Sequence, residues 1–392
     1  MKIRVDKIDV SGKTVFLRVD FNVPLKDGVI QDNTRIVKAL DTIRYLNSHG
    51  AKLVIASHLG RPKGEVKPEL SLKPVAKELS RLISKEIIFP GEVIGEKVDK
   101  AKESLKEGDI LLLENVRFIK GETKNEETFA KELAKGIDIY VNDAFGASHR
   151  AHSSVVGIAS YVKLSAMGFL ISKEIEYLSM ATENPKKPYI AILGGAKVKD
   201  KIPLIENLLD KVDTLLIGGG MAYTFLKEKG FKIGKSLFDA EHFEESKALM
   251  EKAEKNGVKM LFPVDHVCVK KIKEDAEIKF FEKDIDNDYI GVDIGEKTVK
   301  SFKEEISRAK LVVWNGPMGV FEIDRFSRGT TEVAKAVANG DLISIIGGGD
   351  SVSAVKKAGV SEKITHISTG GGASLEFLSG KKLPGIECLS DK

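Results

Sequence analysis

Glycine clusters stand at four places where an apolar run of the sequence ends. They read LGGAK (193–197), IGGG (217–220), IGGGDS (346–351) and TGGG (369–372). Glycine lets a ligand approach the main chain, and the N-terminus of a following helix adds partial positive charge that suits a phosphate. One such cluster is explained equally well as a tight turn without a ligand. Four clusters in corresponding places favour a nucleotide site in the second half of the chain.

The known phosphate-binding signatures are absent from these clusters. None spells GxxxxGK[ST], and none is a GxGxxG that opens a helix with an acid about twenty residues later. The missing fingerprint disfavours a dinucleotide-dependent dehydrogenase. A non-catalytic phosphate or nucleotide sensor stays open as an alternative to an enzyme.

Asp350 adds a hard oxygen ligand directly after the third cluster, where a phosphate chain would lie. A carboxylate acting together with phosphates is a common way to hold Mg²⁺. The alternative is that Asp350 only caps a helix over residues 351–359, and one side chain could do both. Lys197 and Lys201 lie four apart after the first cluster, so both point the same way if a helix has begun there.

The first half of the chain carries polar and cationic side chains, not glycines, after its apolar runs. These are Asp20, Asn22, His58, Arg61, Glu114, Asn115, Arg117, His149, Arg150 and His152. Most of the arginines also precede residue 151. A guanidinium grips a carboxylate or phosphate through two bonds at once, whereas Lys is a hydrated point charge. We therefore expect an anion site in the first half.

Two further groupings have less specific readings. Asp265, His266 and Cys268 of PVDHVC suggest a metal site, but neighbours along a strand face opposite ways, so strand residues with satisfied partners are favoured. The histidines cluster with arginines, and the sequence has no GxSxG nucleophile elbow, which argues against a hydrolase. His149 and His152 are expected to support anion binding, with a helix surface as the alternative.

Strand-like apolar runs alternate with longer helical patterns along the whole chain. The runs are TVFLRV, KLVIAS, DILLLE and DIYVND, then YIAILGG, TLLIGGG, KLVVWNG, LISIIGGG and THIST. Near-continuous Val, Ile and Leu are typical of parallel strands covered on both faces, and Phe129 and Leu133 lie at helical spacing between two runs. The sequence predicts doubly wound, Rossmann-like α/β domains, in which ligands bind at the carboxyl ends of the strands.

The length of 392 residues predicts two domains, because a single core stops growing below this size. A hinge helix is expected between them. Ile171, Ile175 and Leu178 fall on one helical face there, before a Pro- and Lys-rich loop at 184–188.

The composition indicates a soluble protein, with 42% hydrophobic and 31% charged residues. No apolar run approaches the roughly 18 residues of a membrane span, and the N-terminus has no signal-peptide pattern, so a cytoplasmic location is expected. A net charge of +4 with 7% aromatic residues does not favour a nucleic-acid partner. Cys268 and Cys388 are expected to be packing or surface thiols. The single Gln31 suggests a thermophilic origin.

Taken together, the motifs resemble one family, phosphoglycerate kinase. The matching segments are RVDFNVP (18–24), SHLGRPKG (57–64), LENVRF (113–118), NDAFGASHRAHSS (142–154), LGGAKVKDKI (193–202), IGGGMAYTF (217–225), WNGPMGVFE (314–322), IGGGDS (346–351) and STGGGASLE (368–376). They extend over essentially the full chain. One departure lies in GASHRAHSS, where Thr and Ala are expected around 147 and 148, and it leaves His149 and Arg150 in place.

The resemblance implies reversible phosphoryl transfer between the acyl phosphate of 1,3-bisphosphoglycerate and ADP, giving 3-phosphoglycerate and ATP, with Mg²⁺. It implies a glycerate site with Arg18, His149 and His152 in the same basic patch. The substrate-binding residues carried over are Asp20, Phe21, Asn22, Arg35, His58, Leu59, Gly60, Arg61, Arg117 and Arg150.

The resemblance also implies a nucleotide site in the second half. Its residues are Lys201, Gly218, Gly219, Gly291, Asn315, Glu322, Gly348, Gly349, Asp350 and Ser351. Among them Asp350 is the metal ligand, Glu322 contacts the ribose, and Gly218 to Gly220 with Gly291 lie near the base. Gly371 and Gly372 present N–H groups to the moving phosphoryl group.

The implied domains are a 3-phosphoglycerate-binding domain at 1–168, a hinge helix and linker at 169–188 and a nucleotide-binding domain at 189–375. A C-terminal segment, 376–392, returns to the first domain, and a monomer is favoured. Because the two substrates fall on different domains, hinge closure around 165–190 is expected.

The implied chemistry needs no general base, because the acceptor is a carboxylate with a pKa of roughly 3.5 that is already ionised at neutral pH. Catalysis should then rest on in-line positioning and on cations around the transferring group. Arg35 and Lys197 are the expected cations, with Lys201 beside them. Their presence, with that of Asp350, favours the enzyme over the sensor.

Overall fold

The computed structural model describes residues 2–392. The chain divides into two compact units. Unit 1 contains the residues up to Glu176 together with Lys382–Lys392, and unit 2 is Tyr177–Lys381. The division at 176/177 falls inside helix α6 (Phe169–Thr182), the helix expected from the spacing of Ile171, Ile175 and Leu178.

Unit 1 is built on a five-stranded sheet in the order β5-β4-β1-β6-β7. Every neighbouring pair in it is parallel. The strands are β1 (Thr14–Arg18), β4 (Lys52–Ala56), β5 (Ile110–Leu112), β6 (Ile139–Asn142) and β7 (Leu164–Met167), and a hairpin of β2 (Leu25–Lys26) and β3 (Val29–Ile30) lies outside the sheet. The central strands are buried almost throughout, as expected for strands covered on both faces.

The helices of unit 1 bury one apolar face each. In α1 the buried residues include Ile36, Leu40 and Ile43, and in α5 the predicted pair Phe129 and Leu133 is buried. The helices are α1 (Thr34–Ser48), α2 (Lys73–Ile83), α3 (Glu96–Ser104), α4 (Gly121–Lys124), α5 (Glu127–Ala134) and α14 (Pro384–Glu387).

Unit 2 contains a six-stranded parallel sheet in the order β10-β9-β8-β14-β15-β16. Its strands are β8 (Tyr189–Leu193), β9 (Thr214–Ile217), β10 (Lys259–Leu261), β14 (Leu311–Asn315), β15 (Ile343–Ile346) and β16 (His366–Ile367). The helices are α7 (Ile202–Leu208), α8 (Ala222–Glu228), α9 (Phe243–Lys255), α10 (Glu296–Ile306), α11 (Arg328–Asn339), α12 (Gly349–Lys357) and α13 (Gly372–Leu378).

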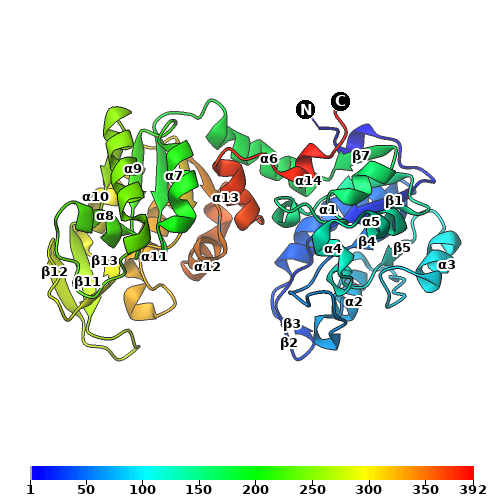
Figure 1. Ribbon diagram of the computed structural model, residues 1–392, viewed down its shortest axis with the longest axis horizontal. Coiled ribbons are helices and arrows are strands. Elements are labelled where there is room, and N and C mark those ends of the chain that lie inside the picture. Colours follow the sequence, from blue (N-terminus) through cyan, green and yellow to red (C-terminus); the bar gives the residue numbers. More distant parts are fainter. Residues whose placement is uncertain (1) are drawn as a thin grey trace. The chain divides into compact units, whose positions relative to one another are not determined.

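A three-stranded antiparallel sheet in unit 2 was not predicted. It has the order β12-β11-β13 and is formed by β11 (Asp265–Val269), β12 (Lys279–Glu282) and β13 (Ile290–Ile294) (Figure 1). The nine apolar runs identified in the sequence do form strands of the two parallel sheets, so the predicted α/β class with parallel sheets is confirmed.

Residues Lys382–Lys392, which include α14 (red in Figure 1), belong to unit 1, whereas residues 376–381 of the expected C-terminal segment belong to unit 2. The Gly385 N–H donates to the Ser148 carbonyl at 2.8 Å, and Asn142 Nδ2 donates to the Gly385 carbonyl at 2.7 Å. Lys2 forms an antiparallel bridge with Asp391, so the two ends of the described chain lie side by side. In residues 2–392 no helix is long and apolar enough to cross a membrane.

Candidate active site

A cluster of charged and polar side chains lies at the carboxyl ends of the unit 1 strands. Arg18 ends β1, Asp20 follows it, His58 follows β4 and Arg117 follows β5. The strands are parallel and adjacent, so their carboxyl ends meet at one edge of the sheet and bring these residues together. Asp20, His58 and Arg117, three of the polar residues predicted for the first half, therefore converge.

Arg18 forms the buried base of this cluster, with no exposed surface. Its Nε donates to Ser154 Oγ at 2.8 Å and its Nη1 to the Val19 carbonyl. Its Nη2 lies 3.2 Å from Nδ1 of His58. A guanidinium held on three sides in this way has a fixed orientation.

Asp20 links Arg35 to His58. Its Oδ2 accepts from Arg35 Nη1, and its Oδ1 lies 3.9 Å from His58 Nδ1. Burial opposes ionisation of Asp20, but the guanidinium groups of Arg35 and Arg18 outweigh it and hold the pKa of the carboxyl below its usual value. Burial, with the nearby arginines, holds the pKa of His58 well below its usual value, so His58 is neutral.

The main chain around the cluster is held by side-chain hydrogen bonds. Asn22 Oδ1 accepts from the Gly60 N–H at 2.8 Å, and Arg117 Nη1 donates to the Gly60 carbonyl at 2.8 Å. The Phe21 N–H donates to Ser57 Oγ, and the Leu59 N–H donates to Asn115 Oδ1 at 3.2 Å. These hydrogen bonds fix the main chain of four predicted residues, namely Phe21, Asn22, Leu59 and Gly60.

The cations of the cluster perturb one another. Burial, then Arg18 and Arg150, lowers the pKa of Arg117 to about 10. Burial, then Arg117 and the same two arginines, lowers the pKa of His152 to about 3. Arg117 Nε is buried without a hydrogen-bond partner in the described chain. Arg61 and Arg150 are exposed, with Arg150 against His149. Excess positive charge and an unused donor suit a multiply charged anion.

Glu122, at the start of α4, belongs to this cluster and was missed. It is fully buried, and its Oε1 lies 4.0 Å from Arg18 Nη2. Its neighbours in KGETKNEE are charged or polar, so the sequence resembles an exposed run. No signal in the local pattern distinguishes it.

The glycine clusters of unit 2 also meet at one strand edge, and they fall into two kinds. A Cβ on Gly194 would lie 2.1 Å from the Pro317 carbonyl, and one on Gly316 would lie 2.1 Å from the Gly194 carbonyl. These two glycines let neighbouring loops pack. A Cβ on Gly195, Gly349 or Gly371 would meet no atom within 4 Å, so their main chain faces open space. The second kind leaves room for a ligand.

Lys201 connects three of the strand ends. Its Nζ donates to Oδ1 of Asn315, the last residue of β14, and Asn315 Nδ2 donates to the Gly347 carbonyl after β15 at 2.8 Å. Burial lowers the pKa of Lys201 to about 8, although Asp200 and Asp350 raise it. Ser351 Oγ accepts from the Gly316 N–H at 2.6 Å and closes the same junction.

Asp350 lies in the first turn of α12 and is exposed. The helix cap is Gly348, at a φ of 91°, so the alternative that Asp350 serves only as the cap is wrong. Residues 2–392 contain no group of three or more His, Cys, Asp or Glu that could hold a metal ion. A single exposed carboxylate fits Mg²⁺ that takes its remaining ligands from phosphates and water.

Lys197 does not pair with Lys201 in the way the spacing suggested. The first helical turn begins at Lys199, so Lys197 lies before it and is exposed, whereas Lys201 turns inward. Within the described chain no acceptor or counter-ion contacts Lys197.

The other predicted nucleotide residues lie in different surroundings. A Cβ on Gly291 would come within 1.7 Å of Tyr223 Oη, so this glycine is needed for packing. A Cβ on Gly218 would lie 2.5 Å from Met318 Sδ, and Gly219 has a φ of 65°. Glu322 is exposed, and its carbonyl accepts from Lys357 at 3.3 Å.

The end of β16 is ordered by serines. Ser368 Oγ and Ser374 Oγ lie 2.5 Å apart, and the Gly370 N–H donates to Ser368 Oγ at 3.1 Å. Gly371, at a φ of 48°, precedes α13, which begins at Gly372.

An apolar residue beside these loops was missed. Leu237 is 55% exposed, and a Cβ on Gly220 would lie 2.5 Å from its Cδ1. An exposed leucine packed against a glycine turn offers a surface for a flat apolar group such as a base. Only its proximity in the fold reveals it.

The PVDHVC segment contains strand β11, as favoured, but the expectation of satisfied partners is wrong for His266, because its Nε2 is buried without a hydrogen-bond partner in the described chain. His266 and Cys268 of β11 are buried, while Asp265 accepts N–H donors of Lys297 and Thr298 at the start of α10, both at 2.8 Å. Cys268 and Cys388 are both free thiols.

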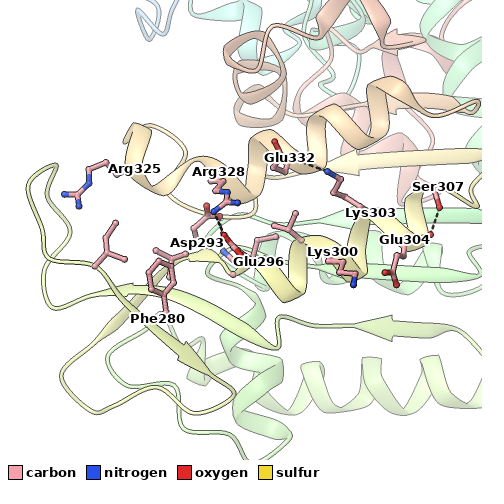
Figure 2. Close-up of a pocket in the computed structure, with 15 residues that line it drawn as sticks. Phe280, Asp293, Glu296, Lys300, Lys303, Glu304, Ser307, Arg325, Arg328 and Glu332 are labelled. Atoms are coloured by element: carbon pink, nitrogen blue, oxygen red, sulfur yellow. Dashed lines mark hydrogen bonds and ion pairs between the residues drawn. The ribbon is translucent and has the colours of Figure 1, made fainter.

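The pocket drawn in Figure 2, of about 660 Å³, lies apart from the strand-end site. It lies between α10, α11 and the antiparallel sheet, over Val267, Ile294 and Val299, beside the ion pairs Arg328–Glu296 and Lys303–Glu332. No residue of the glycine clusters lines it. The size of this pocket is therefore no reason to place the reaction in it.

Known proteins share both the sequence and the fold of this chain. The phosphoglycerate kinase family model matches residues 5–381. The chain is 57% identical to a phosphoglycerate kinase of Clostridium tetani over 394 aligned positions, covering 100% of this chain and 98% of that protein. It is 56% identical to one of Clostridium botulinum, covering 100% of this chain and 99% of that protein.

Solved structures agree with these relatives. The fold is similar to a phosphoglycerate kinase from Coxiella burnetii, with a TM-score of 0.90, 42% identity and coverage of 99% of this chain and 98% of that one. It is also similar to one from Pyrococcus horikoshii, with a TM-score of 0.82, 36% identity and the same coverage. The chain belongs to the phosphoglycerate kinase family.

Proposed function

We propose that this enzyme transfers the acyl phosphate of 1,3-bisphosphoglycerate to ADP, giving ATP and 3-phosphoglycerate, and that the two strand-end sites divide the task. The contrast between the two sites supports this assignment of one substrate to each. At the unit 1 edge burial and the neighbouring guanidinium groups lower the pKa of Arg117, whereas the unit 2 edge has open main chain at Gly349 and Gly371. The first suits a small, highly charged acid and the second a phosphate chain.

In the proposed acidic-substrate site the arginines bind the anionic groups of 3-phosphoglycerate. Arg117 has an unused Nε donor, and Arg35 is already oriented by Asp20. Arg61 and Arg150 are exposed and able to reach a ligand. A bound anion would offset the burial and the repulsion from Arg18 and Arg150 that lower the pKa of Arg117.

In the proposed nucleotide site Lys201 meets the phosphates, while Gly218, Gly219, Gly291 and Leu237 lie toward the base. Glu322 is exposed and is assigned to the ribose. Asp350, with phosphate oxygens, would hold Mg²⁺, which when bound neutralises charge on the transferring group.

The transfer step needs no proton acceptor, because the attacking carboxylate is ionised at neutral pH. The contribution of the protein is then orientation and positive charge. We assign this charge to Arg35, Lys197 and Lys201, with the N–H groups of Gly371 and Gly372. The exposed position of Lys197, without a partner in the described chain, leaves it available for the phosphoryl group.

Because the two ligands are assigned to different units, we propose that transfer requires the two sites to come together and exclude water. X-ray scattering should then give a smaller radius of gyration with both ligands than with either alone. We also propose a cytoplasmic monomer of thermophilic origin. Light scattering checks the monomer, and the midpoint of thermal denaturation checks the thermophilic origin.

Trapping with hydroxylamine tests the reaction. The protein, ATP, Mg²⁺ and 3-phosphoglycerate form the acyl phosphate, and hydroxylamine attacks its carbonyl carbon to give a hydroxamate and release phosphate. Hydroxamate in proportion to enzyme is expected, and none without 3-phosphoglycerate. Nucleotide binding without any hydroxamate would instead support the sensor.

A further inference from the structure

Glu122 is a fully buried carboxylate beneath the proposed acidic-substrate site, and it has no assigned role. Its Oε1 accepts from the Ser154 hydroxyl at 2.6 Å, and its Oε2 accepts from the Ser154 N–H at 2.9 Å. It also lies 4.0 Å from Arg18 and 3.8 Å from Nδ1 of His152. A buried charge with this many partners is held in one place.

Ser154 connects Glu122 to Arg18. A hydroxyl has one proton to donate, and Ser154 gives it to Glu122, so its oxygen is free to accept from Arg18 Nε at 2.8 Å. The direction of both hydrogen bonds is thus set by the carboxylate. Glu122 also supplies the negative charge that buried Arg18 needs.

Arg18 in turn determines the tautomer of His58. A guanidinium has only donors, so in the 3.2 Å contact Arg18 Nη2 donates and His58 Nδ1 accepts. Neutral His58 must then carry its proton on Nε2. No described residue accepts a hydrogen bond from this nitrogen, so its N–H is left for a ligand.

We propose that Glu122 is a positioning residue for the acidic substrate. Through Ser154 it orients Arg18, and Arg18 holds His58 in the tautomer that offers Nε2–H to the bound anion. This inference rests on the proposed assignment of 3-phosphoglycerate to the unit 1 cluster.

Two variants break the chain of contacts at different points. Glu122→Gln keeps the shape but removes the charge and places an amide where an acceptor is needed. Ser154→Ala removes the hydroxyl and keeps the carboxylate. Both should raise KM for 3-phosphoglycerate by about tenfold, with KM for ATP unchanged and kcat within about threefold. Glu127→Gln is the matched control, because Glu127 is exposed and paired with Lys131 at 2.6 Å.

Nitrogen-15 NMR of the imidazole groups reads the positioning directly. In the parent, the His58 signals should be those of the Nε2–H tautomer, and both variants should shift them toward a mixture. Unchanged His58 signals and an unchanged KM in a folded Ser154→Ala protein would overturn the proposal, even if Glu122→Gln does not fold. If the parent forms no hydroxamate, the proposed function fails, whereas the tautomer signals still decide whether Glu122 positions His58.

Discussion

Lys201 Nζ donates a hydrogen bond to Oδ1 of Asn315, and this contact fixes an ammonium group between the glycine loops that follow β8 and β15. The same Asn315 side chain binds the Gly347 carbonyl at 2.8 Å. Lys201 is therefore held by a neutral partner and not by a carboxylate. Its charge stays available for a phosphate.

The low pKa of Lys201 predicts a pH dependence of nucleotide affinity. Below about pH 8 the free protein carries the charge, and above it the charge is lost, so ADP affinity should fall as pH rises through 8. Calorimetric titration at pH 7 and pH 9 should show a decrease of up to about tenfold. Lys201→Arg should flatten the profile, and the exposed Lys199→Ala should follow the parent. A parent profile that is flat over this range would contradict the prediction.

Two glycine substitutions should separate packing from binding. Gly349→Ala adds a Cβ that meets no protein atom, so stability should be unchanged while ADP affinity falls about tenfold because the phosphates occupy that space. Gly194→Ala places a Cβ 2.1 Å from the Pro317 carbonyl and should lower the free energy of unfolding by about 1 to 3 kcal/mol. Urea denaturation and ADP titration measure both. Unchanged ADP affinity in Gly349→Ala would show that the phosphates do not occupy the space beside Gly349.

Asp143 should make the stability of unit 1 depend on pH. Its Oδ1 accepts from the Ile171 N–H at the start of α6 at 3.1 Å, and burial raises its pKa to about 7. The folded protein keeps a proton that the unfolded chain, with a pKa of about 4, releases. The stability from this group is therefore full below about pH 4 and is lost as pH rises through 7.

Asp143→Asn removes this titration and keeps the acceptor for Ile171. The free energy of unfolding of this variant minus that of the parent should be larger at pH 8 than at pH 5, by on the order of a few kcal/mol. The urea midpoint at each pH reports the difference, and the exposed Asp341→Asn serves as the control. An equal difference at both pH values would show that Asp143 is ionised throughout.

Asp350 should contribute to nucleotide binding only when magnesium is present. Asp350→Asn should weaken binding of the Mg²⁺ complex of ADP by about tenfold, because one oxygen ligand of the metal is lost. In EDTA, ADP should bind equally well or more tightly, since a carboxylate repels phosphates. Calorimetry under both conditions decides. An equal loss of ADP affinity with and without Mg²⁺ would show that Asp350 is not a ligand of the metal.

The sequence predicted the parallel strands because both of their faces are buried, which leaves uninterrupted apolar runs such as YIAIL in β8. β12 was not found, because KFFE is charged at both ends and largely exposed, with Phe280 at 69%. Its pairing with β11 is a tertiary contact that no local pattern contains.

The candidate site was predictable where residue type alone carries the chemistry, as for the arginines and the open glycines. Relationships that depend on where a helix begins were not predictable. Lys197 and Lys201 share a spacing of four but not a helix, since the turn starts at Lys199. Glu122 and Leu237 were missed because burial of a carboxylate and exposure of a leucine are decided by packing.

The activity of Arg35→Ala tests the central claim most directly, namely that oriented cations and not a proton acceptor drive the transfer. Arg44→Ala is the matched control, because Arg44 is exposed and lies on the same helix, α1. With the hydroxamate assay, Arg35→Ala should lower kcat by about 10³ to 10⁵, by analogy with other arginines that stabilise phosphoryl transfer, while Arg44→Ala stays near the parent. An Arg35→Ala enzyme within about tenfold of the parent would contradict the account.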